Sequence, residues 1–197
     1  MKLIDITQEL FTCHVYPGDP QPERNQIQFT DKGDMCNLTR FSMCAHNGTH
    51  VDAPYHFIGS GKTIDQMGLT PYVGDCYVAR HDGDVTAEVM ASILSRAKSA
   101  GAAERILIGG DATMTEEGAK VLSDSGVILF GNESQTVGPL MSPAAVHMIL
   151  LGNEVTLLEG VVLKDVPEGV YFLSAAPLNL GGADGAPCRA YLISKDD

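Results

Sequence analysis

The segment from His46 to His56 constrains this chain more than any other stretch, because it places three imidazoles and a carboxylate within eleven residues, His-Asn-Gly-Thr-His-Val-Asp-Ala-Pro-Tyr-His. All four donors stand at even positions, so an extended backbone would direct them to one side. If the first part of the segment forms a helical turn instead, His46 and His50 still meet at a spacing of four residues. Neutral imidazole and carboxylate are the ligands that zinc and similar divalent ions prefer. The segment therefore predicts a metal site that draws on His46, His50, Asp52 and His56.

The backbone of this segment is expected to avoid a long helix. Thr49 and Val51 are β-branched, and Ala53 precedes a proline, which disfavours the helical conformation. Gly48 allows the chain to bend close to whatever the side chains bind. The segment is thus expected at a strand end or in a tight loop, and the sequence leaves both possibilities open.

The length and composition predict a single α/β domain that spans residues 1–197. A chain of 197 residues with 44% hydrophobic content can bury one well-packed core, and no linker-like segment divides it. The first seven residues include an acidic side chain and no sustained apolar run, which argues against a signal peptide and a membrane span. We therefore expect a cytoplasmic protein.

Charge and cysteine content narrow the function further. A net charge of −12 without a cluster of Lys or Arg opposes binding to nucleic acid and to anionic membranes, so the expected partner is a small-molecule substrate. The five cysteines are odd in number and include no Cys-x-x-Cys pair, which predicts reduced thiols and no disulfide framework. Cys13 and Cys44, which stand near histidines, are the two thiols to consider as ligands or nucleophiles.

Short β-branched or aromatic runs between turn residues predict strands, and segments of helical periodicity lie between them. The expected strands are Leu3 to Ile6, Arg105 to Ile108, Gly126 to Phe130, Val155 to Leu158, Val170 to Ala175 and Arg189 to Ile193. The expected helices are Thr86 to Ala100, with Asp84 as an available cap and Gly101 as a stop, roughly Glu116 to Ser123, and Ser142 to the residue before Gly152, with Pro143 in the first helical position.

Two polar residues stand in apolar surroundings further along the chain. His147 lies in Ala-Ala-Val-His-Met-Ile-Leu-Leu, and Glu159 closes the run Val-Thr-Leu-Leu. From the residues alone, His147 is better read as a hydrogen-bonded core histidine, and Glu159 as an exposed strand end.

The motif His-x-Gly-Thr-His-x-Asp-x-Pro-x-His resembles that of the cyclase family of metal-dependent hydrolases, which includes bacterial kynurenine formamidase and isatin hydrolase. The resemblance covers nearly the whole chain. Further matching segments are Asp5-Ile-Thr, Tyr16-Pro-Gly-Asp19, Tyr72-Val-Gly-Asp, the helix with His147, Glu159-Gly-Val-Val-Leu, Ala176-Pro-Leu, Gly181-Gly-Ala-Asp and Pro187-Cys-Arg189-Ala. The resemblance implies a cyclase-like fold, a swivelling mixed β-sheet flanked by helices, and a homodimer or homotetramer.

The same resemblance implies roles for individual residues. It makes His46, His50 and Asp52 metal ligands, lets His147 and Glu159 complete a second metal position, and places His56 beside the metals. The implied cofactor is one or two Zn²⁺ per chain, with Mn²⁺ as an alternative. Asp52 is the carboxylate best suited to bridge two ions, and His56 is the expected catalytic proton shuttle.

These ligands predict hydrolysis of a small amide by a metal-activated water. An aryl formamide of the N-formylkynurenine type is the favoured substrate, and opening of a cyclic amide or lactone is the alternative. A non-catalytic metal-binding protein is a third reading, which His56 disfavours because a storage site has no need of an additional base. The chain lacks tryptophan, so the residues on which an aryl group would stack are Tyr16, Phe29, Tyr55 or Phe57. Ser134 and Gln135 are candidates to orient the substrate. Asn47 and Thr49 are candidates to support the metal ligands through hydrogen bonds.

Overall fold

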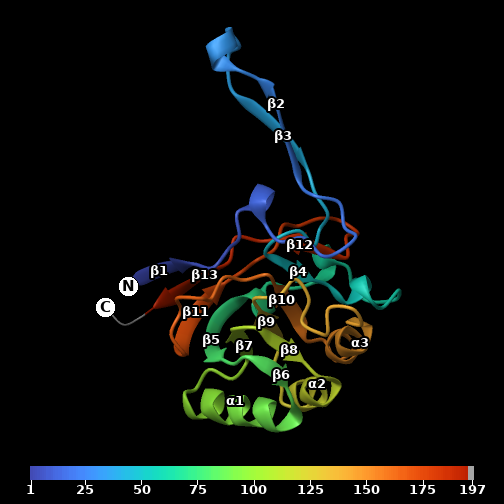
Figure 1. Cartoon of the computed structure of the whole chain (residues 1–197), viewed down its shortest axis with the longest axis vertical. Coiled ribbons are helices and arrows are strands. Elements are labelled where there is room, and N and C mark those ends of the chain that lie inside the picture. The colour runs from blue at the N-terminus through green and yellow to red at the C-terminus, as the bar shows by residue number, and fades with distance from the viewer. Residues whose placement is uncertain (195–197) are drawn as a thin grey trace.

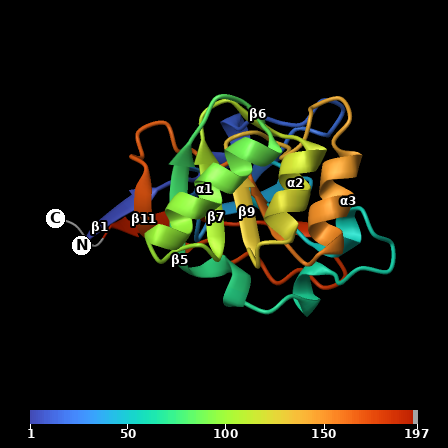
Figure 2. The same cartoon turned by 90° about the horizontal axis from the view of Figure 1, so that it is seen from below.

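A curled mixed sheet of nine strands forms the centre of the computed structural model, which describes residues 1–194. In spatial order the strands are β1 (Lys2–Asp5), β13 (Tyr191–Ser194), β11 (Gly169–Ser174), β5 (Val73–Arg80), β7 (Arg105–Gly109), β9 (Leu129–Asn132), β10 (Thr156–Glu159), β4 (His50–Asp52) and β12 (Gly185–Pro187). The helices α1 (Ala87–Ser99), α2 (Glu116–Ser123) and α3 (Ala144–Gly152) lie side by side over one face of the sheet (Figure 1, Figure 2). The predicted α/β class with a mixed sheet is confirmed.

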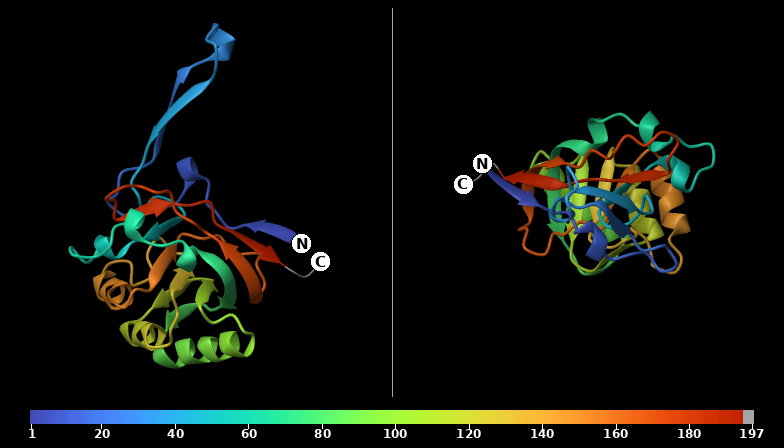
Figure 3. Two further views of the ribbon diagram at one scale, coloured as in Figure 1. Left: turned by 180° about the vertical axis from the view of Figure 1, so that it is seen from behind. Right: turned by 90° about the horizontal axis from the view of Figure 1, so that it is seen from above.

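The middle of the sheet is parallel and its flanks are antiparallel. Strands β5, β7, β9 and β10 run in the same direction, whereas β4 and β12 on one side and β11, β13 and β1 on the other pair antiparallel. Lys2 is opposite Ser194 in the β1–β13 pair, so the two ends of the described chain lie side by side (Figure 3). Before β13, the strand β12 pairs with β4, which carries the motif, at the opposite edge of the sheet.

Both faces of the sheet are buried, and successive residues of one strand enter different cores. In β7, Ile106 and Ile108 pack with the helices, whereas Leu107 between them belongs to the second core. The same alternation separates Phe130 from Leu129 in β9. This is the period of two expected of a strand that is covered on both sides.

Two short pairings stand outside the main sheet. Strands β6 (Gly83–Val85) and β8 (Ala112–Met114) pair in parallel beside the helices. Strands β2 (Glu23–Gln28) and β3 (Leu38–Ser42) form an antiparallel hairpin that projects from the body (Figure 1, Figure 3). We call residues 23–42 the hairpin arm; its apolar side chains Ile27, Met35, Leu38 and Phe41 are all exposed.

Every strand and helix expected from the sequence is present, with ends displaced by a few residues. Two details of the helix ends were wrong. The hydroxyl of Thr86, not Asp84, caps α1 by accepting a hydrogen bond from the backbone of Val89, and Pro143 is the N-cap of α3 and not its first residue. No helix among residues 1–194 is both long and apolar enough to cross a membrane.

The strand β5 was missed although it is the longest in the sheet. Gly74 and Asp75 interrupt its apolar pattern, but the glycine has a structural reason. A Cβ on Gly74 would lie 2.7 Å from Cζ of Arg105, whose buried guanidinium donates to the carbonyls of Thr70 and Pro71. Gly74, which interrupts the apolar pattern of β5, is therefore also the residue that leaves room for the buried side chain of Arg105.

Candidate metal centre and active site

The motif is extended in its middle and bent at both ends. His50–Asp52 forms β4, which pairs with β10 on one side and β12 on the other, so His50 and Asp52 point to the same side. Before the strand, His46 lies in a turn, and Gly48 has a positive φ of 66°. After it, Pro54–His56 forms one turn of 3-10 helix. Both conformations that the sequence left open therefore occur, in different parts of the segment.

Asp52 lies at the middle of the cluster and turns its two oxygens to different imidazoles. Oδ1 is 2.8 Å from Nδ1 of His46 and 3.3 Å from Nε2 of His50. Oδ2 is 3.6 Å from Nε2 of His147. Asp52 is fully buried, so its carboxylate is surrounded by these imidazoles and not by water.

Glu159 and His147 complete the cluster from β10 and α3. Nε2 of His147 is 3.1 Å from Oε1 of Glu159, and Oε2 of Glu159 is 3.4 Å from Nε2 of His50. Both residues are only 2% exposed. The reading of Glu159 as an exposed strand end was wrong, because β10 is an interior strand between β9 and β4 and the side chain of Glu159 is buried against His50 and His147.

The hydrogen bonds of two histidines show that the cluster fits a cation. Nδ1 of His50 donates to the carbonyl of Gly48 and Nδ1 of His147 donates to that of Pro143, each at 2.9 Å. In the neutral imidazoles, the lone pairs on Nε2 then face carboxylate oxygens, an arrangement that a cation between them would stabilise. Among residues 1–194, Nε2 of His50 and Oδ2 of Asp52 are buried without a hydrogen-bond partner.

The separations between the donor atoms agree with this reading. Those of 3.1 to 3.6 Å within the cluster of His50, Asp52, His147 and Glu159 are typical of ligands that share an ion about 2.0 to 2.2 Å from each donor. Two groups of three residues bring their donor atoms within 4.8 Å of one another: His46, Asp52 and His56, and His50, Asp52 and Glu159. Asp52 belongs to both groups, so the described residues can hold a divalent metal.

Buried carboxylates change the protonation of the imidazoles in the metal-free protein. Burial opposes a charge on His50, but the carboxylates of Asp52 and Glu159 outweigh it and raise the pKa of His50 to about 10. By the same balance the pKa of His147 rises to about 10 and that of His46 to about 9. The imidazoles in turn outweigh burial at Asp52 and hold its pKa well below the usual range. The centre thus attracts positive charge before any metal binds.

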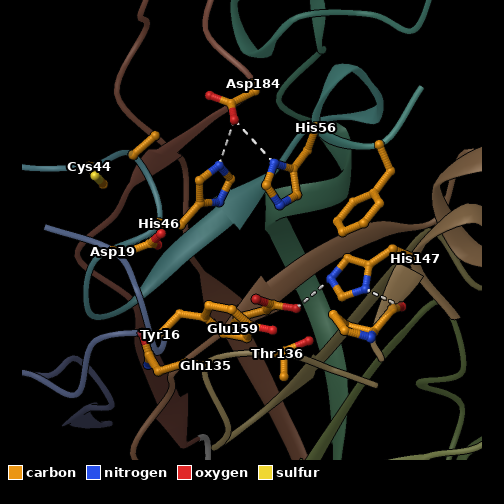
Figure 4. Close-up of a pocket in the computed structure, with 13 residues that line it drawn as sticks. Tyr16, Asp19, Cys44, His46, His56, Gln135, Thr136, His147, Glu159 and Asp184 are labelled. Carbon is orange, nitrogen blue, oxygen red and sulfur yellow. Dashed lines mark hydrogen bonds and ion pairs between the residues drawn. The ribbon is translucent and has the colours of Figure 1, made fainter. Parts of the chain in front are cut away.

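His56 stands at the edge of this cluster and differs from the other imidazoles. Its ring stacks on that of His46, with the centroids 3.9 Å apart and the planes at 29°. Its Nδ1 is 3.1 Å from Oδ2 of Asp184 (Figure 4). Burial is the main cause that lowers the pKa of His56. His56 is therefore the one motif histidine favoured as a neutral ring in the metal-free protein.

Asp184 is a site residue that sequence reasoning did not single out. It lies just before β12, and its Oδ2 is also 2.8 Å from Nε2 of His46. The sequence separates these two residues by 138 positions, and the family-like segment Gly181-Gly-Ala-Asp that ends in Asp184 carried no assigned role. Only the return of the chain to pair β12 with β4 brings it to the motif.

A pocket of about 450 Å³ opens next to the cluster (Figure 4). Its lining includes His46, His56, His147 and Glu159 together with Tyr16, Phe57 and Gln135, which were predicted to contact substrate. Neither amide atom of Gln135 has a hydrogen-bond partner among residues 1–194, and the amide packs where a side chain on Gly160 would collide with it.

Three further residues that were predicted to contact substrate lie away from this pocket. Phe29 is on the hairpin arm, where Nζ of Lys32 sits 3.7 Å from its ring centroid, and Tyr55 and Ser134 are exposed outside the pocket lining. Phe29 was proposed only because it is aromatic. Since it lies on the projecting hairpin arm (Figure 1), its ring is far from the pocket in the same chain. Ser134 instead serves the loop, where its carbonyl accepts from the backbone of Gly160.

Asn47 and Thr49, the two motif residues predicted to support the ligands, are buried. The hydroxyl of Thr49 donates to the carbonyl of Gly160 at 2.6 Å, and the amide oxygen of Asn47 accepts from the backbone of Cys44 at 2.8 Å. Cys44 lines the pocket, whereas Cys13 packs on Gly48. Burial raises the pKa of both thiols, which opposes a nucleophilic thiolate at either position.

The family model Cyclase, described as "Putative cyclase", matches residues 4–158. A kynurenine formamidase of Erythrobacter litoralis is 32% identical in an alignment of 210 positions that covers 100% of this chain and 95% of the relative. The kynurenine formamidase of Salinibacter ruber is 31% identical, in an alignment that covers 100% of both chains.

Solved structures agree with this relationship. A potential metal-dependent hydrolase with cyclase activity has a TM-score of 0.81 and 30% identity, with 97% of this chain and 96% of that chain covered. An isatin hydrolase bound to the product analogue thioisatinate has a TM-score of 0.85 at 19% identity, over 98% of this chain and 93% of that chain, and shows the same fold. The chain belongs to the Cyclase family.

Proposed function

We propose that this protein is a metal-dependent amidohydrolase whose substrate is an aryl formamide of the N-formylkynurenine type. The observation that carries the proposal is Asp52, whose two buried oxygens face separate imidazoles beside an open pocket. The names of the similar kynurenine formamidases support the choice of a formamide.

The residues proposed to hold the metal are His46, His50, Asp52, His147 and Glu159. Asp52 would hold metal at the centre of this set, with His46 and His50 near its Oδ1 and His147, beside Glu159, near its Oδ2. We propose one or two Zn²⁺ per chain, with Mn²⁺ as the alternative. When bound, such a dication supplies a Lewis acid and lowers the pKa of water from about 15.7 toward 7.

His56 is the proposed catalytic base. Its Nδ1 is held by Asp184, while in Figure 4 the other ring nitrogen points toward the interior of the pocket. In the hydrolysis, the water oxygen adds to the formyl carbon, and His56 removes the proton of the water. The C–N bond then breaks as His56 gives that proton to the leaving amine, so the products are formate and the free aryl amine.

The remaining lining residues are proposed to orient the substrate. Phe57, whose ring lies 4.4 Å from that of His147, and Tyr16 offer the aromatic surface for an aryl group. The amide of Gln135 can donate to or accept from the polar part of the substrate because its own chain leaves it without a partner.

A cyclic amide is the second candidate substrate, and the fold shared with isatin hydrolases supports it. Zn²⁺-loaded and Mn²⁺-loaded protein should be assayed against N-formylkynurenine, a series of formanilides, and isatin. We expect the formamides to have the highest kcat/KM and chelator to abolish turnover. Hydrolysis of isatin alone would replace the formamide assignment, and no hydrolysis by metal-loaded protein would contradict the enzyme reading.

We also propose that two copies of the chain associate through the hairpin arm. An isolated two-stranded hairpin is marginally stable in water, yet this one carries exposed Ile27, Leu38 and Phe41. Light scattering should give the mass of a dimer or larger homo-oligomer for the wild type. The double variant Ile27→Asp/Leu38→Asp should be monomeric and the exposed control Asn25→Asp should not; a monomeric wild type would contradict the proposal.

A further inference from the structure

One oxygen of Asp184 contacts two stacked imidazoles of the motif. Oδ2 lies 2.8 Å from Nε2 of His46 and 3.1 Å from Nδ1 of His56 (Figure 4). A carboxylate oxygen only accepts hydrogen bonds, so each of these ring nitrogens carries its proton toward Asp184. In the neutral rings, the lone pair of His46 is therefore on Nδ1, next to Asp52, and that of His56 is on Nε2.

The backbone fixes Asp184 at this position from both sides. The backbone N–H of Ala53 donates to the carbonyl of Asp184 at 2.9 Å, and the next residue, Gly185, is opposite Asp52 in the β12–β4 pairing. A Cβ on Gly185 would lie 2.7 Å from Cε1 of His46. The backbone next to Asp184 thus lies too close to the His46 ring to carry a side chain at position 185 without a shift.

We propose that Asp184 is the positioning carboxylate of this site, which sets the tautomers of His46 and His56 together. The inference rests on the proposed metal-dependent hydrolysis and adds a residue to it. With both protons held by Asp184, His46 presents Nδ1 on the side of Asp52, and His56 presents Nε2 to the substrate pocket. A ligand and a base are thereby oriented by one group.

The position and exposure of Asp184 distinguish this role from that of another ligand. Oδ2 of Asp184 is 2.8 Å from Nε2 of His46, the length of a charge-assisted hydrogen bond, and 3.1 Å from Nδ1 of His56, the length of an ordinary one. The side chain of Asp184 is 41% exposed, whereas those of Asp52 and Glu159 are 0% and 3% exposed. The ring of His46 lies between Asp184 and Asp52, with one nitrogen next to each carboxylate.

The test compares Asp184→Ala and Asp184→Asn with Asp165→Ala, which removes the same charge from an exposed loop residue. The first readout is ¹⁵N NMR of the histidine rings in Zn²⁺-loaded protein, which reports the tautomers without a substrate. We expect the protonated Nδ1 of His56 in the wild type and in Asp165→Ala. In Asp184→Ala the resonances of His46 and His56 should shift or broaden, and Asp184→Asn should retain part of the wild-type pattern.

The second readout is Zn²⁺ affinity, measured by competition with a chromophoric chelator. Loss of a group that orients a ligand typically weakens metal binding by about 10- to 100-fold, and we expect that range for Asp184→Ala. At saturating Zn²⁺, kcat should also fall by about 10- to 100-fold while KM changes less than about twofold. In a His56→Ala background the same substitution should reduce kcat by a smaller factor, because the base it orients is gone.

Unchanged histidine resonances in Asp184→Ala, together with Zn²⁺ affinity equal to that of Asp165→Ala, would overturn the proposal. The proposal would also be overturned if Asp184→Ala reduced kcat by the same factor in the His56→Ala background as in the wild type. If the wild type hydrolyses none of the amides, the proposed function fails, and the NMR spectrum and Zn²⁺ affinity still decide the role of Asp184.

Discussion

Glu159 is directly opposite His50 in the antiparallel pairing of β10 with β4, and its Oε2 lies 3.4 Å from Nε2 of that histidine. The register of two short strands therefore brings a carboxylate to the motif from far along the chain. Parallel pairing of β10 with β9 fixes the other edge of the same strand. The position of Glu159 is thus set by the pairing of its strand with β4 on one edge and with β9 on the other.

Asp52 and His56 should respond differently to truncation. Asp52→Ala should remove metal and activity together, because both halves of the cluster use this carboxylate. His56→Ala should retain metal and lower kcat by roughly 10²- to 10⁴-fold, the usual contribution of general acid–base catalysis. Elemental analysis and kcat on the same preparations are the measurements, with His81→Ala as a control outside the pocket lining. Metal loss in His56→Ala would make that residue a ligand.

Local spacing and periodicity predicted most elements and the clustering of His46, Asp52 and His56, whereas His147 and Glu159 joined the candidate ligands only through the family resemblance. The sequence could not predict Asp184, whose relation to His46 exists only through the pairing of β12 with β4. It also could not show that Phe29 leaves the body on the hairpin arm, since aromatic composition does not tell where a hairpin points. The burial of Glu159 could not be predicted for a similar reason, because the strand β4 that pairs with β10 is distant in sequence.

Binding of Zn²⁺ to the chelator-treated protein at pH 7 should release protons. The pKa values of His46, His50 and His147 are raised to about 9, 10 and 10, so all three rings are protonated at pH 7 and must lose a proton to act as ligands. Calorimetry in buffers of different ionisation enthalpy measures the number released. Binding without proton release would show that these rings are already neutral.

The same shifts predict how the stability of the chelator-treated protein depends on pH. Because the folded pKa values exceed the unfolded value of 6.5, the stabilisation is fully present below pH 6.5 and is lost as the pH rises through about 10. The Tm should therefore fall across this range, and less so with Zn²⁺ bound. A Tm that rises with pH in the chelator-treated protein would contradict the sign.

Gln135→Ala should weaken substrate binding more than chemistry. Gln135 lines the pocket and its buried amide has no hydrogen-bond partner among the described residues, so a hydrogen bond to substrate predicts a KM increase of about 2- to 10-fold with kcat little changed. Ser134→Ala next to it, outside the pocket lining, is the control. Equal kinetics in the two variants would remove Gln135 from substrate recognition.

Gly185→Ala should destabilise the protein and disturb His46. The added Cβ would lie 2.7 Å from Cε1 of that ring and 2.7 Å from the carbonyl oxygen of Val51, and such overpacking costs about 1 to 3 kcal/mol. Urea unfolding and Zn²⁺ affinity are the measurements. Gly181→Ala, where an added Cβ meets no atom within 4 Å, should leave both unchanged. Wild-type values for Gly185→Ala would show that His46 can move aside freely.

Anomalous diffraction at the zinc edge on crystals of Zn²⁺-loaded protein shows whether the Asp52 cluster binds the metal. We expect Zn²⁺ about 2.0 to 2.2 Å from an oxygen of Asp52, with ligands drawn from His46, His50, His147 and Glu159, and His56 outside the coordination sphere. At full occupancy of both positions, the two oxygens of Asp52 should bind different ions. Zn²⁺ bound elsewhere while this cluster stays free of metal would contradict the account.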